Sequence, residues 1–184
     1  MGPLVVVFAL RREAWLHGPL MTTPALALRG VLLLTFGLIE AAVILLAFRV
    51  PHITSGGLVV VVTAFLLLDA VACFLGAARE PGNRPWLILQ GLASLVAGVL
   101  FPVGALPRGL ILFAWWAIVI GVLEGAAWVT SRRGHLAVSV LSLLLGVGYL
   151  VSPVRDPARV LIAIAAYAIL AGLLRLTAAR AARG

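Results

Sequence analysis

Residues 86–125 read WLILQGLASLVAGVLFPVGALPRGLILFAWWAIVIGVLEG. Two apolar runs, Trp86–Val103 and Leu110–Thr130, are joined here by a short turn that holds Pro107 and Arg108. An α-helix needs about 20 mainly apolar residues to cross the hydrocarbon core of a bilayer. The stretch therefore predicts two membrane-spanning helices joined by a tight connection.

The rest of the chain has the same apolar character. Of its 184 residues, 64% are hydrophobic and 11% are charged, and the mean hydropathy is +1.20. A soluble domain has about 25% charged residues, and its surface needs more polar cover than this chain offers. Intrinsic disorder is excluded as well, because it needs low hydrophobicity. The composition predicts an all-α integral membrane protein whose solvent is the lipid bilayer.

Six apolar runs are long enough to be read as spans, the third and fifth being close to the lower limit of length. The predicted spans are residues 30–48, 57–78, 86–103, 110–130, 136–151 and 160–177. They make up a membrane domain of residues 26–180, followed by a short tail of residues 181–184. The fold class predicted is thus a bundle of six transmembrane helices.

The arginines indicate the orientation of these spans. All 14 basic residues are arginine, and ten of them fall on the side that carries both chain ends. The ten are Arg11, Arg12, Arg29, Arg79, Arg84, Arg132, Arg133, Arg175, Arg180 and Arg183. By the positive-inside rule both termini are cytoplasmic. The net charge of +8 does not indicate nucleic-acid binding, because the arginines occur singly or in pairs between apolar runs.

Residues 1–25 precede the first span as a cytoplasmic extension. The positive charges follow the short apolar run at Leu4–Leu10, which argues against a cleaved signal peptide. Leu4–His17 is either an amphipathic helix on the cytoplasmic leaflet or part of a disordered extension, with Met21 as the natural start in place of Met1.

The last four spans contain one helix pair twice. Two positions of the first helix, a serine and a glycine, match positions 48 residues later. A proline and two positions of the second helix match positions 51 residues later. The matched residues are Ser94 and Ser142, Gly98 and Gly146, Pro102 and Pro153, Gly121 and Gly172, and Glu124 and Arg175. Gly30 and Gly37 have the spacing of Gly91 and Gly98, so spans one and two form a diverged first copy. We predict three tandem helix hairpins with the same orientation.

The second copy resembles the short repeat of HdeD-type acid-resistance membrane proteins. It has a tryptophan, then G-x-x-S-x-x-x-G-x-x-x-P, then W-x-I-x-x-G-x-x-E. The matching residues are Trp86, Gly91, Ser94, Gly98, Pro102, Trp116, Ile118, Gly121 and Glu124. The third copy departs in having His135 near the Trp position and Arg175 in place of the acid, and the first copy departs most. The resemblance covers roughly residues 27–180.

This resemblance implies six spans and a role in acid or envelope stress in the bacterial inner membrane, and it supplies no catalytic residue. Two other functions stay open. The first is a small proton- or solute-linked transporter or channel that uses acidic residues within the spans. The second is a scaffold subunit of a larger membrane complex.

Four ionisable residues lie within the predicted spans: Glu40, Asp69, Glu124 and Arg175. A charge at the bilayer centre costs about 2.5–3.5 kcal/mol on insertion scales, so these residues are expected to face one another. One hypothesis is a polar cluster that holds the bundle together, with Glu124 or Asp69 paired to Arg175, unless Arg175 reaches the cytoplasmic surface. The other is that Glu40 or Asp69 is buried, neutral at neutral pH, and relays protons or senses pH.

The remaining polar residues indicate no enzyme, metal or cofactor. His17, His52 and His135 lie outside the predicted spans, so no histidine pair is placed to hold a haem. No serine or cysteine has a histidine nearby on a helix face, and the only cysteine, Cys73, is predicted to be a packed apolar side chain.

Small residues spaced four apart allow close helix approach. These pairs are Ser94 and Gly98, Gly121 and Gly125, and Ser142 and Gly146. We predict that they make contacts within one chain. Contacts in a homo-oligomer or with another membrane protein are the alternative.

Overall fold

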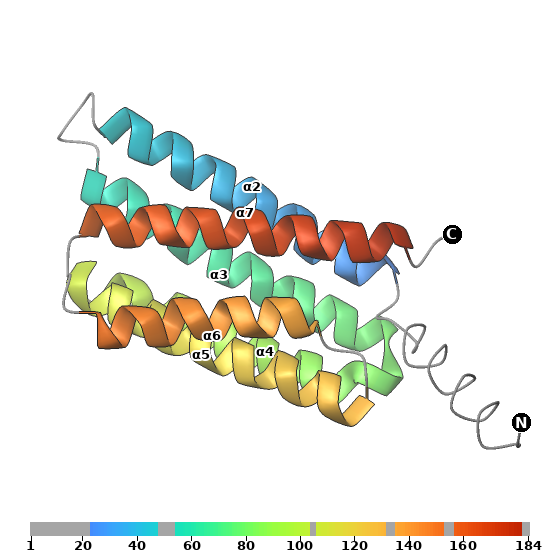
Figure 1. Ribbon diagram of the computed structural model, residues 1–184. Coiled ribbons are helices and arrows are strands. Elements are labelled where there is room, and N and C mark those ends of the chain that lie inside the picture. Colours follow the sequence, from blue (N-terminus) through green and yellow to red (C-terminus); the bar gives the residue numbers. More distant parts are fainter. Residues whose placement is uncertain (1–22, 48–53, 104–105, 132–134, 153–156, 182–184) are drawn as a thin grey trace, which may run out of the picture.

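The computed structural model describes residues 23–47, 54–103, 106–131, 135–152 and 157–181 (Figure 1). The predictions for the amphipathic segment and for the start at Met21 therefore lie outside the described residues. So does most of the predicted tail.

The described residues are 98% helical and contain no strand. The α-helices are α2 (Thr23–Ala47), α3 (Thr54–Arg79), α4 (Arg84–Leu100), α5 (Leu106–Ser131), α6 (Leu136–Val151) and α7 (Pro157–Ala181). Two single-turn 3-10 helices, η2 (Pro81–Asn83) and η3 (Phe101–Val103), flank α4. Prolines in the first turns of η2 and α4 mark these breaks, because proline lacks the N–H that a helix interior needs.

Five apolar segments of the described chain are long enough to cross a membrane. They are Ala27–Leu46, Gly56–Arg79, Pro81–Val103, Arg108–Thr130 and Arg159–Arg180. The helix α6 is equally apolar but has only 16 residues, or about 24 Å at 1.5 Å per residue. The all-helical fold is confirmed, and five of the described segments are long and apolar enough to cross a membrane.

The helices run beyond several of the predicted spans. The helix α2 begins at Thr23, so Arg29 lies inside it and not in a flanking loop. The side chain of Arg29 is 2% exposed. The predicted span begins after Arg29 because a charged residue usually ends an apolar run, but an arginine with a buried partner does not end a helix.

The six α-helices form a closed ring in which each packs on the next and α7 packs on α2. Figure 1 shows α7 beside α2, although they lie at opposite ends of the sequence. The most extensive interfaces are those between hairpins, namely α2 with α7, α3 with α4, and α5 with α6. The helices of one hairpin pack less extensively.

Glycines make these interfaces close. A Cβ atom added at Gly37 of α2 would lie 2.9 Å from the carbonyl oxygen of Ala165 in α7. A Cβ atom at Gly146 of α6 would lie 2.5 Å from the carbonyl oxygen of Ala114 in α5. Ala114 and Ala165 are themselves 51 residues apart. The two glycines therefore meet equivalent atoms of equivalent residues, as the sequence repeat predicts.

The residues predicted to pack helices face other helices of the same chain. Gly98 approaches Leu66 and Leu67 of α3, and Gly121 and Gly125 approach Ser139 of α6. These small residues therefore make contacts between helices within the chain.

An aromatic layer fills the middle of the bundle. Phe36 stacks on Phe65 at 4.1 Å between ring centroids, and Phe65 meets the edge of Trp116 at 5.8 Å. Phe113 lies against Trp116 at 4.9 Å. Outside the ring, aliphatic side chains such as Leu45 and Leu144 are 68% and 65% exposed, as expected of side chains that face lipid.

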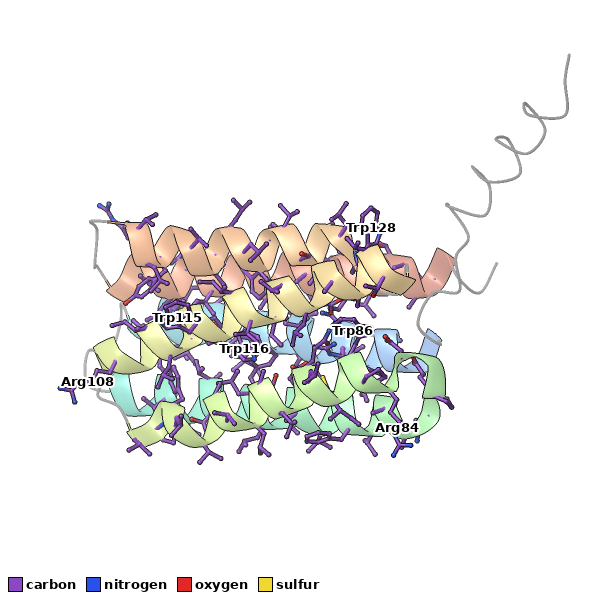
Figure 2. The ribbon with its side chains drawn as sticks, turned by 90° about the horizontal axis from the view of Figure 1, so that it is seen from below. Arg84, Trp86, Arg108, Trp115, Trp116 and Trp128 are labelled. Atoms are coloured by element: carbon purple, nitrogen blue, oxygen red, sulfur yellow. The ribbon has the colours of Figure 1, made fainter. Side chains whose placement is uncertain are left out.

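Arg84 and Arg108 mark the two ends of the bundle (Figure 2). Trp86 and Trp128 lie towards the Arg84 end, and Trp116 lies between the ends. We call these ends the Arg84 end and the Arg108 end. Tryptophans are enriched at membrane–water interfaces, and Trp86 and Trp128 lie near one end of the bundle.

Candidate functional site: a buried charge cluster

Four charged side chains from four helices meet in the core towards the Arg84 end. They are Arg29 of α2, Asp69 of α3, Glu124 of α5 and Arg175 of α7, and each is at most 2% exposed. We call them the charge cluster. Two arginines face two carboxylates, so the formal charge of the cluster is zero.

Arg29 and Asp69 form a two-point ion pair. The Nε of Arg29 donates to Oδ1 of Asp69 at 3.0 Å, and Nη2 donates to Oδ2 at 3.3 Å. The remaining Nη1 donates to Oε1 of Gln90 in α4 at 2.5 Å. The planar guanidinium matches the carboxylate edge in this arrangement, and it ties α2 to both α3 and α4.

Glu124 forms the second ion pair. The Nη2 of Arg175 donates to its Oε1 at 2.6 Å, and the backbone N–H of His135 donates to its Oε2 at 3.1 Å. Nη1 of Arg29 lies 3.6 Å from Oε1 of Glu124. This contact joins the two pairs into one network that spans α2, α3, α5 and α7.

A chain of hydrogen bonds leads from the cluster to the aromatic layer. The hydroxyl of Ser94 donates to Oδ2 of Asp69 at 2.8 Å, and Nε1 of Trp116 donates to Oγ of Ser94 at 2.9 Å. The thiol of Cys73, which is completely buried, lies 3.9 Å from the same Oδ2. Each polar group from Trp116 to Asp69 therefore has a partner in the core.

The serine–aromatic bond recurs in the third hairpin. Ser142 Oγ and the hydroxyl of Tyr167 are 2.8 Å apart, at positions that match Ser94 and Trp116. In the first hairpin the same spacing gives Leu33 and Phe65, both buried and apolar. Both partners are replaced together, which avoids the cost of leaving a buried donor or acceptor alone.

Ser94→Ala is expected to lower the free energy of unfolding by about 1–3 kcal/mol, because the indole N–H of Trp116 loses its acceptor in the core. Thr130→Ala is the matched control, since the Thr130 hydroxyl donates only to the carbonyl of Ala126 on the exposed side of α5. Equilibrium unfolding in detergent micelles measures the difference. Equal stability of the two variants would mean that the Ser94 bond does not contribute.

The structure brings together three of the four predicted ionisable residues. Glu124 pairs with Arg175 as one of the two expected pairings, whereas Asp69 pairs with Arg29. Glu40 is not part of the cluster. It lies 11 residues after Arg29 in α2, which is about 16 Å along the helix, and neither of its oxygens has a hydrogen-bond partner.

Sequence reasoning missed Arg29 and Gln90. Arg29 was counted among the ten arginines of the cytoplasmic side. Without Arg29 and Arg175, which are buried, eight arginines remain there against four on the other side. The repeat carries a signal that finds the missed pair, because Arg29 precedes Gly30 as Gln90 precedes Gly91.

His135 lies half-buried beside the cluster, at the start of α6. Burial lowers the pKa of its imidazole below the ordinary value of 6.5, Arg175 lowers it further, and Glu124 opposes the shift. The folded state therefore favours neutral His135.

Acidification is expected to weaken the fold through His135. Above pH 6.5, the ordinary pKa of histidine, His135 is neutral in both the folded and the unfolded protein. As the pH falls below 6.5, the unfolded chain takes up a proton that the folded chain resists. Stability is therefore lost as the pH falls through the lower pKa that His135 has in the folded state. Thermal unfolding between about pH 8 and about pH 5 measures this. His135→Asn is expected to flatten the profile, and a wild-type profile unchanged by the substitution would contradict the assignment.

Comparison with known proteins gives one match, over residues 28–103, which span α2 to η3. No curated protein and no solved structure matches the chain. The match includes the first hairpin, which was expected to depart most from the repeat. This part of the chain is similar to the family described as "Short repeat of unknown function (DUF308)", which is the domain of HdeD-like membrane proteins.

Proposed function

We propose that the chain is a non-enzymatic, six-span protein of the bacterial inner membrane that acts in resistance to acid or envelope stress, as HdeD-type proteins do. The match to the short repeat over residues 28–103 supports the family. The closed ring supports six spans, because α6 lies between α5 and α7, and a short helix can cross where the bilayer thins locally. Both termini then lie in the cytoplasm, on the side with more arginines.

The charge cluster supports the non-transporting part of this proposal. Both of its carboxylates are paired with buried arginines from other helices. Removing one partner from such a pair is strongly destabilising, so the cluster holds four helices in register. This is the arrangement of a structural element. A proton carrier needs a group that is free to change its charge.

The hydrogen-bond chain also favours this function over a proton-linked transporter. The polar network runs from the backbone N–H of His135 through the charge cluster to Trp116, and one of its links is the 3.6 Å ion contact between Arg29 and Glu124. There it meets the aromatic layer, where Phe36 and Phe65 offer no acceptor. Trp116 is a donor only, and its single indole N–H is already used on Ser94, so Trp116 cannot continue the network towards the Arg108 end. A relay across the whole bundle would need such a continuation.

An acid-survival assay tests the proposed function. Deletion of the gene is expected to lower the survival of the source bacterium after acid challenge, and the wild-type gene is expected to restore it. The Thr130→Ala gene, which leaves the cluster intact, is expected to restore survival as well. Purified wild-type protein in liposomes is expected to give no proton flux above that of empty liposomes. Unchanged survival on deletion would contradict the stress role, and flux that Glu40→Gln abolishes would favour the transporter.

A further inference from the structure

Glu40 is the buried acid that the proposed function does not use. Its side chain is 0% exposed, and neither Oε1 nor Oε2 has a hydrogen-bond partner. The other two buried acids within spans, Asp69 and Glu124, each accept hydrogen bonds from an arginine. Glu40 thus lies in the core without the compensation that those two carboxylates receive.

The position of Glu40 is one that the fold fills with an aromatic ring elsewhere. Glu40 follows Gly37 by three residues, as Phe101 follows Gly98 and Tyr149 follows Gly146. Phe101 is 1% exposed and packs against Gly109. Packing in this ring of hairpins therefore does not require an acid at this position, and an apolar side chain satisfies it in the second hairpin.

The helices that pack on α2 offer Glu40 no ionic partner. The ionisable residues in the described parts of α2, α3 and α7 are Arg29, Asp69, Cys73, Arg79, Arg159, Tyr167, Arg175 and Arg180. Arg29, Asp69 and Arg175 are committed to the charge cluster, Cys73 lies against Asp69, and Tyr167 is bonded to Ser142. Arg79, Arg159 and Arg180 are exposed near the ends of their helices.

The side of α2 next to Glu40 borders a groove and not a sealed interface. The groove has a volume of about 210 Å³ and lies between α2 and α3. Apart from Thr35 its lining residues are apolar, and they include Ile39, the neighbour of Glu40 in α2, and Val60 and Val61 of α3. Such a groove admits lipid chains more readily than water, so it does not hydrate a carboxylate nearby.

An isolated carboxylate in an apolar core costs far more than a neutral acid there, so the group keeps its proton. We propose that Glu40 is a proton-binding site, held as a neutral carboxylic acid at neutral pH by the closed ring of helices. Its proton is lost only when the α2–α3 side of the bundle opens to water. The site does not depend on the stress role, because it follows from the burial and isolation of Glu40 alone.

Infrared spectroscopy of the whole protein in lipid tests this proposal. At about pH 7 a water-exposed glutamate is ionised, so a neutral acid is recognised by its carboxylic C=O stretching band. The difference spectrum of wild type minus Glu40→Gln is expected to contain that band. The matched control is wild type minus Glu124→Gln, which is expected to contain carboxylate bands in place of the carboxylic C=O band.

The outcome separates the two states of Glu40. A Glu40 difference spectrum that shows only carboxylate bands would overturn the proposal. If Glu40→Gln does not fold, Glu40→Leu replaces it, because the equivalent positions are aromatic and apolar volume fits there. Glu40→Leu is also expected to raise the melting temperature. Failure of the acid-survival assay would leave this result unaffected, so the two proposals fail independently.

Discussion

Asp69→Ala is expected to lower the free energy of unfolding by about 3–5 kcal/mol. The substitution removes both acceptors of the Arg29 ion pair and leaves a buried guanidinium with Gln90 and the more distant Glu124. It also removes the acceptor of the Ser94 hydroxyl. Reversible unfolding in detergent micelles, monitored by circular dichroism, measures the loss.

The matched control for this prediction is the double variant Arg29→Met with Asp69→Leu. Replacing both members of a buried pair with apolar side chains of similar volume is often neutral or stabilising. The double variant is therefore expected to keep more stability than Asp69→Ala alone. If Asp69→Ala unfolds like the wild type, the charge cluster does not hold the helices together.

Gly146→Ala is expected to destabilise the bundle by about 1–3 kcal/mol or more. The added Cβ atom would lie 2.5 Å from the carbonyl oxygen of Ala114 and 3.0 Å from the backbone N of Ile118. These are backbone atoms of the neighbouring helix, so no change of rotamer relieves the clash. The helices α5 and α6 have to separate.

Gly148→Ala is the matched control in the same helix. A Cβ atom there would have no neighbour within 4 Å, and alanine favours helix over glycine by about 1 kcal/mol. This variant is expected to be as stable as the wild type or slightly more stable. Thermal unfolding of the two variants side by side measures the contrast. Equal melting temperatures would show that α6 does not approach α5 as closely as described.

The sequence predicted the helical membrane architecture and the repeat because both leave periodic marks. Apolar runs set the helices, and the recurrence of Gly121 at Gly172 located equivalent contacts. The pairing of Glu124 with Arg175 could be predicted for the same reason, since the two residues occupy equivalent positions in their repeats. Residues at equivalent positions of the sequence repeat make equivalent helix contacts.

The partners of the charges were harder to predict. The position of a charged residue within a predicted span indicates its depth in the membrane but not the direction in which its side chain points. The prediction therefore groups Glu40 with residues that it does not contact. Arg29 was placed in a loop because a lone arginine at the edge of an apolar run resembles a flanking charge. Only the alignment of Arg29 with Gln90 distinguishes a buried arginine from an arginine in a flanking loop.

The closed ring, in which α2 packs on α7, is the central claim and is tested most directly by a cysteine cross-link. A Cβ atom at Gly30 would lie 3.0 Å from Cγ of Leu176. At the equivalent place between α5 and α6, a Cβ atom at Gly125 would lie 3.9 Å from Cβ of Ser139, within the range of about 3.5–4.5 Å found in disulfides. The second pair joins helices adjacent in sequence and serves as the positive control.

Both pairs are made in a chain with Cys73→Ala and oxidised in isolated membranes. We expect Gly30→Cys with Leu176→Cys to form a disulfide within one chain as readily as Gly125→Cys with Ser139→Cys, seen as a faster-migrating monomer. If the control pair forms and the Gly30–Leu176 pair stays reduced or links two chains, α2 does not close the ring on α7 and the account is wrong.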